Sequence, residues 1–161
     1  MEGICGLFSF DQSIPDTVPA MNKMVNTLSD GEPVDVNIFA NSHWALGIAR
    51  WPSDTWQPIT FSYQDESIAL VAVGDILNFD ALTKETGVDA NEKDKLLAAL
   101  CRKTDNWPER IRGTFAIIIF DKTSQTLIAA TDRFGIRPLC WFKNGNTIYL
   151  ASRLNAIKAV V

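Results

Sequence analysis

The residues that could carry out chemistry in this chain begin with a cysteine close to the amino terminus. Cys5 lies in an apolar stretch, residues 3–10, which is typical of a short strand. A thiol in this place has two roles open to it. It can be a small buried hydrophobic side chain, or it can be a nucleophile whose base is the chain's own α-amino group, once the residues before it are removed. An α-amino group titrates near ~8, so close to neutral pH it can accept the thiol proton.

The cysteines and the histidine argue against a disulfide framework and a zinc site. The three cysteines, Cys5, Cys101 and Cys140, are an odd number at wide spacing, which argues against a disulfide framework. That usage favours a reducing compartment, and we expect a cytoplasmic protein. The one histidine, His43, has no Cys/His cluster around it, so we expect no zinc site. These residues imply no metal and no cofactor.

Composition limits the partners. The chain has 161 residues, enough for one domain with a substantial core. Its net charge is −4 and its Lys and Arg residues are scattered, which argues against a nucleic-acid partner. No apolar run approaches the ~20 residues of a membrane-spanning helix, and the short acidic amino terminus does not resemble a signal peptide. We therefore expect neither nucleic acid nor membrane as a partner.

The elements that must position a site are strands mixed with helices. Apolar residues at helical spacing predict a helix over residues 16–29. Asn78 and Gly87 predict the start and end of a short helix, and Asn91 can cap a longer one that runs to about residue 101. The runs 68–73 and 114–121 are apolar on both faces, as in strands that are covered on both sides. Two sheets stacked face to face with helices outside satisfy this pattern, so we expect an α+β fold.

Four separated motifs resemble a known family. Residues 131–141, TDRFGIRPLCW, resemble the "RDRFGIKPLYY" signature of class II glutamine amidotransferase domains in the asparagine synthetase family. Residues 112–116 together with Asp121 resemble "RGMFAFAIWD", and residues 151–157 resemble "ASEIKAL". Gln57-Pro58 resembles the family's "QP". The motifs occur in the family's order, and the resemblance covers essentially the whole chain.

The resemblance implies both a fold and an activity. The family fold is the N-terminal-nucleophile hydrolase fold, a four-layer αββα sandwich of two mainly antiparallel sheets. In the family, a cysteine follows the initiator methionine, which is removed. Its thiolate attacks the side-chain amide of glutamine, forms a glutamyl thioester and releases ammonia. The ammonia passes to an ATP-dependent synthetase domain or subunit, which is absent from residues 1–161. We expect residues 1–161 to form a single amidotransferase-like domain. We also expect that this domain can form a homodimer.

The resemblance also assigns a role to each matching position. Cys5 is the expected nucleophile, and Arg50 is expected to hold the glutamine α-carboxylate, since a guanidinium can bind a carboxylate through two parallel hydrogen bonds. Gly74 keeps a backbone N–H for the oxyanion. Asp75 and Glu92 replace acids that grip the substrate ammonium. In the plainer alternative, Arg50 is a surface arginine at a strand end, and the two acids are solvated residues at helix starts.

The amino terminus departs from the family pattern. Four residues precede Cys5, so removal of Met1 alone leaves the amine on Glu2. Three residues of extended chain span up to ~10 Å, too far for that amine to act as the base. Some relatives cleave a propeptide before the cysteine, so removal of residues 1–4 is the alternative.

The oxyanion site departs as well. Val73 stands where the family has an asparagine, and loss of one such donor typically lowers turnover by ~10²–10³-fold. The family's "HRGPD" loop is not recognisable in residues 27–35, and Ile48 stands where a histidine is usual. We therefore expect the glutaminase half of an amide-forming ligase, weak or degenerate. The alternative is a non-catalytic scaffold for a synthetase or cyclase partner that does not use ammonia, as in β-lactam synthetases and lasso-peptide cyclases.

Overall fold

In a computed structural model of the chain, residues 2–11, 13–14, 16–32, 34–52 and 59–161 are described. Met1 and the Gln57-Pro58 motif lie outside the described residues.

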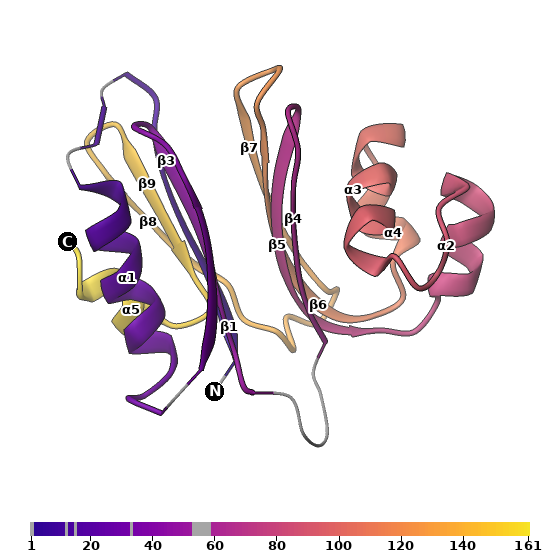
Figure 1. Cartoon of the computed structure of the whole chain (residues 1–161), viewed down its shortest axis with the longest axis horizontal. Helices are drawn as coiled ribbons and strands as arrows, with labels where there is room; N and C mark the ends of the chain where they lie inside the picture. The colour runs from indigo at the N-terminus through magenta and orange to yellow at the C-terminus, as the bar shows by residue number, and fades with distance from the viewer. Residues whose placement is uncertain (1, 12, 15, 33, 53–58) are drawn as a thin grey trace.

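Strands form two sheets in which every pairing is antiparallel. Figure 1 shows the two sheets stacked face to face. One sheet has the order β2 (Asp35–Ala40), β3 (Trp44–Arg50), β1 (Gly3–Ser9), β9 (Thr147–Ala151) and β8 (Cys140–Asn144). The other has the order β4 (Ile59–Gln64), β5 (Ile68–Ile76), β6 (Gly113–Asp121) and β7 (Thr126–Thr131).

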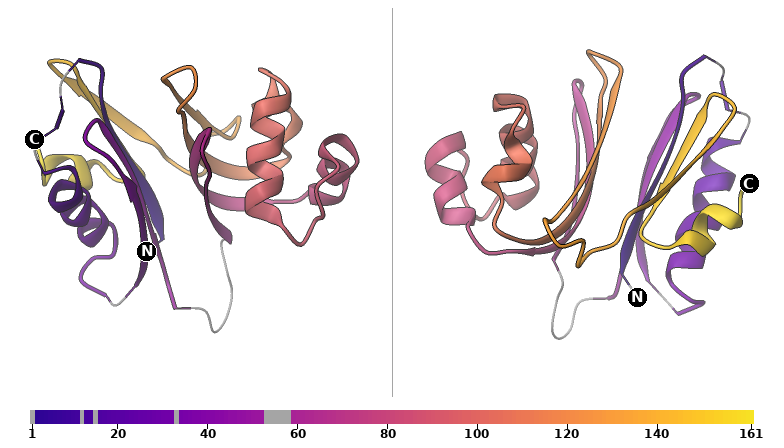
Figure 2. Two further views of the ribbon diagram at one scale, coloured as in Figure 1. Left: turned by 45° about the horizontal axis from the view of Figure 1, so that its top comes forward. Right: turned by 180° about the vertical axis from the view of Figure 1, so that it is seen from behind.

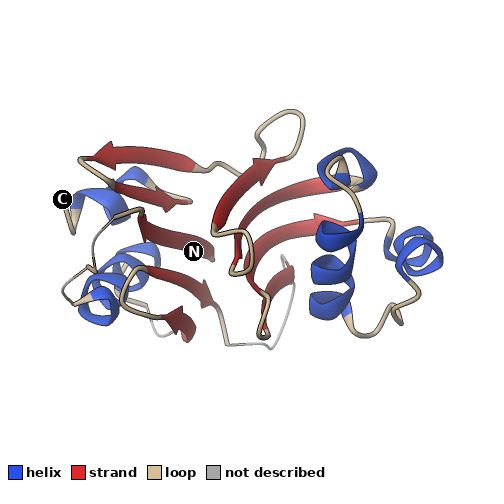
Figure 3. Cartoon of the chain, turned by 90° about the horizontal axis from the view of Figure 1, so that it is seen from above, coloured by secondary structure: helices blue, strands red, loops and turns tan. Residues whose placement is uncertain are grey.

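Helices cover the outer face of each sheet (Figures 1 and 3). The sheet that contains β1 is covered by α1 (Thr17–Leu28) and α5 (Leu154–Lys158). The other sheet is covered by α2 (Phe79–Thr86), α3 (Lys93–Lys103) and α4 (Trp107–Arg110). The four-layer αββα sandwich predicted from the sequence is therefore confirmed. Within the described ranges, no helix is both long enough and apolar enough to cross a membrane.

Strand β1 lies at the centre of its sheet and is buried along its whole length. Its side chains alternate between two apolar clusters. Ile4 and Phe8 belong to the cluster between the sheets, whereas Cys5 and Leu7 belong to the cluster beneath α1 and α5. The cluster between the sheets consists of Ile4, Phe8, Trp44, Leu46, Ile48, Ala69, Val71, Val73, Ala116, Ile118, Phe120 and Leu150. The alternation decides which residues of β1 can reach a space between the sheets.

Strand β5 runs further than its apolar pattern indicates. The sequence predicts its end at Gly74-Asp75, but pairing with β6 continues to Ile76. At this end the two backbones approach so closely that a Cβ on Gly74 would overlap the carbonyl oxygen of Thr114. Gly74 also has a φ of 153°, which other residues rarely adopt. A glycine is therefore required here for the strands to stay paired.

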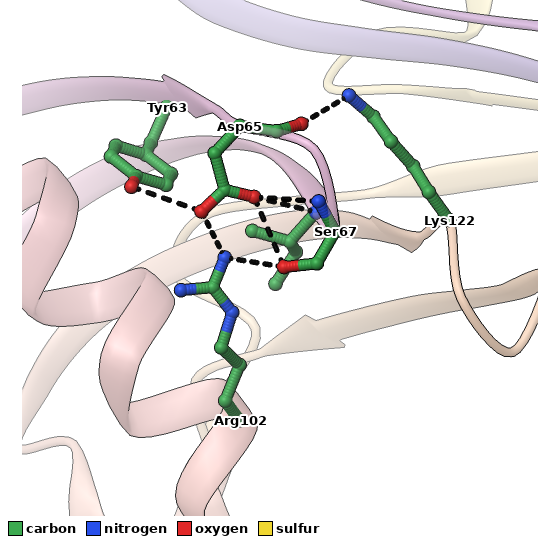
Figure 4. Close-up of polar contacts among 6 residues, drawn as sticks. Tyr63, Asp65, Ser67, Arg102 and Lys122 are labelled. Carbon is green, nitrogen blue, oxygen red and sulfur yellow. Dashed lines mark hydrogen bonds and ion pairs between the residues drawn. The ribbon is translucent and has the colours of Figure 1, made fainter.

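One carboxylate joins the β4–β5 hairpin to α3 (Figure 4). Asp65 accepts hydrogen bonds from the backbone N–H (2.8 Å) and the hydroxyl (3.0 Å) of Ser67 and from the hydroxyl of Tyr63 (3.1 Å). Arg102 of α3 forms an ion pair with the same carboxylate. Burial would raise the pKa of Asp65, but the Arg102 and backbone contacts together hold it below its usual range.

We expect Asp65→Ala to lower the free energy of unfolding by about 1–2 kcal/mol, because Arg102 and the turn N–H groups lose a common acceptor in a partly solvated place. The neighbouring turn carboxylate supplies the control: Glu66 is exposed, and Glu66→Ala should change stability by less than about 0.5 kcal/mol. Urea unfolding followed by circular dichroism measures both. Equal midpoints for the two variants would show that the network adds nothing.

Candidate functional site

A cavity of about 310 Å³ opens at the end of the sandwich where β1 begins. The connection from β7 to β8 crosses between the sheets at the same end (Figure 2). Both sheets and this connection contribute side chains to the cavity wall, and two of these side chains, Glu2 and Arg137, carry opposite charges. The cavity is lined by Glu2, Val73, Ile136, Arg137, Pro138 and Ser152.

Cys5 does not face this cavity. Its side chain is 0% exposed and lies on the α1 side of the sheet, with Sγ 3.2 Å from Sδ of Met21 and 3.7 Å from the carbonyl oxygen of Gly47. Burial among apolar groups raises the pKa of the Cys5 thiol well above its ordinary value. Because the thiolate is the nucleophilic form, this environment suits a structural cysteine. The structure does not bring Cys5 together with Val73 and Glu2.

Burial of Cys5 gives a direct prediction about its reactivity. In a Cys101→Ala/Cys140→Ala background, Cys5 is the one remaining thiol. We expect it to react with a disulfide reagent at pH 8 about 100-fold more slowly than in urea-unfolded protein, because reaction requires local opening of the sheet. The absorbance of the released thiolate measures both rates. Reaction of the folded protein at the unfolded rate would contradict the placement of Cys5 beneath α1.

Glu2 occupies the place at the cavity where the sequence analysis expected a thiol. It precedes β1 and lines the cavity beside Val73, which belongs to the cluster between the sheets. Burial, the largest effect, raises the pKa of Glu2, and the charges of Arg137 and Arg50 partly offset it. Glu2 was missed as a site residue, although counting back by twos from Phe8 and Ile4 places it on the same face of the strand.

Arg50 lies at the end of β3 and is half-buried, with Nη2 3.5 Å from Oγ of Ser62. Burial raises the pKa of Glu2 and of Asp94 in α3. The positive charge of Arg50 lowers both pKa values, but by less than burial raises them. The predicted arginine is therefore near two acids. Asp94 is a half-buried acid that the sequence analysis did not single out.

The other predicted residues lie in two separate places, on β5 and at the start of α3. Val73 is buried and Gly74 follows it at the close approach of β5 to β6. Asp75 is exposed. Glu92 is also exposed and pairs with Lys95 at 3.3 Å, and it lines a separate hollow of about 480 Å³ between α3 and β4. The structure brings Glu92 near Asp94 but does not bring Asp75 or Glu92 to the cavity that Glu2 lines.

Asp132 fixes the connection that carries Arg137 to the cavity. Asp132 is 5% exposed, and its carboxylate accepts hydrogen bonds from the backbone N–H groups of Phe115 (3.3 Å), Phe134 (3.1 Å), Ile136 (3.2 Å) and Arg137 (3.1 Å). Burial alone would raise the pKa of Asp132, but these four donors together lower it. The motif over residues 131–141 contains both residues, yet their roles appear only once the loop is folded.

Comparison with known proteins decides the family. The whole chain, residues 1–161, matches the model of the "Glutamine amidotransferase domain". This chain belongs to that family. It is 25% identical to "Asparagine synthetase [glutamine-hydrolyzing] 3" of Bacillus subtilis, over 99% of this chain and 28% of the relative. It is 28% identical to "Putative asparagine synthetase [glutamine-hydrolyzing] 2" of Methanocaldococcus jannaschii, over 99% of this chain and 35% of the relative.

A solved structure agrees with the fold. The glutamine phosphoribosylpyrophosphate amidotransferase of Bacillus subtilis superposes with a TM-score of 0.73 and 19% identity, over 98% of this chain and 43% of that chain. The class II amidotransferase fold of the asparagine synthetase family, expected from the motifs, is thus confirmed. The chain spans about a third or less of the length of the two synthetases named above.

Proposed function

We propose that this glutamine amidotransferase domain does not hydrolyse glutamine and instead serves as a scaffold for an ATP-dependent synthetase or cyclase partner that takes no ammonia from it. The observation that carries the proposal is the position of Cys5. Its thiol is 0% exposed beneath α1, on the opposite side of the sheet from the cavity lined by Glu2 and Val73. A weak glutaminase acting through Cys5 is the alternative.

The chemistry available at the cavity supports the proposal. Hydrolysis of an amide needs a nucleophile beside donors that stabilise the developing oxyanion. Here the cavity offers the carboxylate of Glu2, whose negative charge would oppose an adjacent oxyanion. Val73 has no donor to add. Neither group favours the tetrahedral intermediate of glutamine hydrolysis.

Cleavage before Cys5 would not restore the missing geometry. The side chain of Ile4 is 0% exposed between the sheets, and its backbone N–H donates to Oγ of Ser152 (3.0 Å). Loss of a buried isoleucine side chain typically costs about 2–5 kcal/mol. Removal of residues 1–4 would therefore weaken the central strand, while the Cys5 side chain would still belong to the cluster beneath α1.

The partner part of the proposal comes from the relatives. Two of them are named as glutamine-hydrolysing asparagine synthetases, and this chain covers 28% and 35% of their length. We propose that a synthetase or cyclase unit likewise accompanies this domain. The homodimer expected from the sequence remains a proposal too, which sedimentation of the purified chain tests.

Intact mass and glutamate release test the proposed function together. We expect purified protein to retain Glu2 and to release no glutamate from glutamine, with Cys5→Ala indistinguishable from the unmodified chain. The matched control is Cys101→Ala, which changes another thiol that packs in the core. A chain that begins at Cys5 and releases glutamate, with that release lost in Cys5→Ala but kept in Cys101→Ala, would establish the glutaminase instead.

A further inference from the structure

The polar atoms around the Glu2 cavity are incompletely paired. Within the described part of the chain, Oε2 of Glu2, Nε of Arg137 and Nε of Arg50 are buried and have no hydrogen-bond partner. Buried polar atoms in folded proteins nearly always have a partner, because leaving one unpaired is costly. Two of these atoms, on Glu2 and Arg137, belong to residues that line the cavity, and they point to a polar group that is bound there.

The two charged groups on the cavity wall face the same space without meeting. Glu2 enters from the start of β1 and Arg137 from the connection between β7 and β8. Both residues are described, and they form no ion pair within 4.0 Å. The cavity therefore has an acceptor on one wall and a donor on another. A ligand that satisfies both must itself carry a donor and an acceptor, as an ammonium and a carboxylate do.

Apolar side chains and the hydroxyl of Ser152, which already accepts a hydrogen bond from the N–H of Ile4, complete the wall. Val73, Ile136 and Pro138 contribute apolar surface between the two charged groups. The volume of about 310 Å³ is at the lower end of the range for small-molecule pockets. A small ligand with an aliphatic body matches this lining better than a ligand with a second polar group.

We propose that this cavity binds a free aliphatic α-amino acid, with its ammonium on Glu2, its carboxylate on Arg137 and its side chain against Val73, Ile136 and Pro138. No covalent step is involved. The binding goes beyond the scaffold role and does not depend on it, because it uses neither Cys5 nor any partner chain. Asp132 contributes by holding the loop that presents Arg137.

Calorimetric titration of the purified full chain at pH 7 tests the proposal on the unmodified protein first. The probes are leucine, isovalerate, isoamylamine and glutamine. Isovalerate lacks the ammonium and isoamylamine lacks the carboxylate, so we expect each to bind at least ten-fold more weakly than leucine. Glutamine should also bind more weakly, because its amide meets hydrocarbon. Equal binding by isovalerate, tighter binding of glutamine or no binding of leucine would overturn the proposal.

Two near-isosteric variants then test the residues. Glu2→Gln and Arg137→Met should each weaken leucine binding at least ten-fold, whereas Glu66→Gln, which changes an exposed acid of the β4–β5 turn, should not. Thermal unfolding of each variant verifies that it is folded. Unchanged affinity in both cavity variants would assign the binding to another place. Because glutamate release is measured separately, failure of this proposal is distinguishable from failure of the scaffold proposal.

Discussion

A double variant, Glu2→Cys/Val73→Asn, processed to begin at residue 2, is expected to release glutamate from glutamine, whereas we expect no release from the unmodified chain. The reason is the position of residue 2. It lines the cavity beside Val73, so a thiol there would have its own α-amino group as base and an asparagine amide as oxyanion donor. Glu2→Cys alone should turn over ~10²–10³-fold more slowly than the double variant, since it lacks that donor.

A coupled dehydrogenase assay of steady-state glutamate release measures the turnover of both variants and of the unmodified chain. The matched control places Cys5→Ala in the double variant and should leave its activity unchanged, because the Cys5 side chain belongs to the α1 side of the sheet. Intact mass must verify that Met1 is removed. If the double variant is folded, correctly processed and still inactive, residue 2 is not at the reactive position and the geometry assigned to the cavity is wrong.

The second large effect concerns stability. Asp132→Ala is expected to lower the free energy of unfolding by about 3–5 kcal/mol, because four backbone N–H groups lose one buried acceptor. Asp105 is exposed, and Asp105→Ala should change stability by less than about 0.5 kcal/mol. Urea unfolding at pH 7 measures both. A loss under 1 kcal/mol for Asp132→Ala would mean that the loop satisfies its N–H groups without the carboxylate.

The pH dependence of this effect has a defined sign. Folding lowers the pKa of Asp132. Its contribution to the free energy of unfolding is therefore complete at pH values above its pKa in the unfolded chain, about 3.9, and is lost as the pH falls through its lower pKa in the folded protein. The difference in stability between the unmodified chain and Asp132→Ala should therefore be constant from pH 7 to 5 and shrink below pH 4. Unfolding curves across that range measure it. A difference that grows on acidification would contradict the lowered pKa.

The layered fold could be predicted because its signal is local and repeated. Strands such as β5 and β6 are apolar on both faces, and only layers on each side can bury such strands. The helix predicted over residues 16–29 is observed as Thr17–Leu28 for a similar reason, since its apolar residues recur at helical spacing. These features depend on neighbours in the sequence, which the sequence displays directly.

The sequence could not predict in the same way which side chains of β1 lie on each face of its sheet. A strand that is buried along its whole length has no alternation of polar and apolar residues, and a shift of one residue exchanges its two faces. The sequence therefore could not tell whether Cys5 or Glu2 reaches the space between the sheets. Asp132 and Arg137 were inside a recognised motif, but their roles depend on a hydrogen bond from Phe115 and on the charge of Glu2, which are distant in the sequence.

The central position of β1 has a consequence for how the protein is made. Cys5 pairs with Gly47 on one side and with Ala151 on the other, so β1 completes its pairing only after β9, far along the chain, has been made. Such non-local pairing slows folding and leaves hydrophobic strand edges exposed during synthesis. Nascent chains of this domain are therefore expected to benefit from chaperones that cover the apolar edges of β1 until β9 has been made.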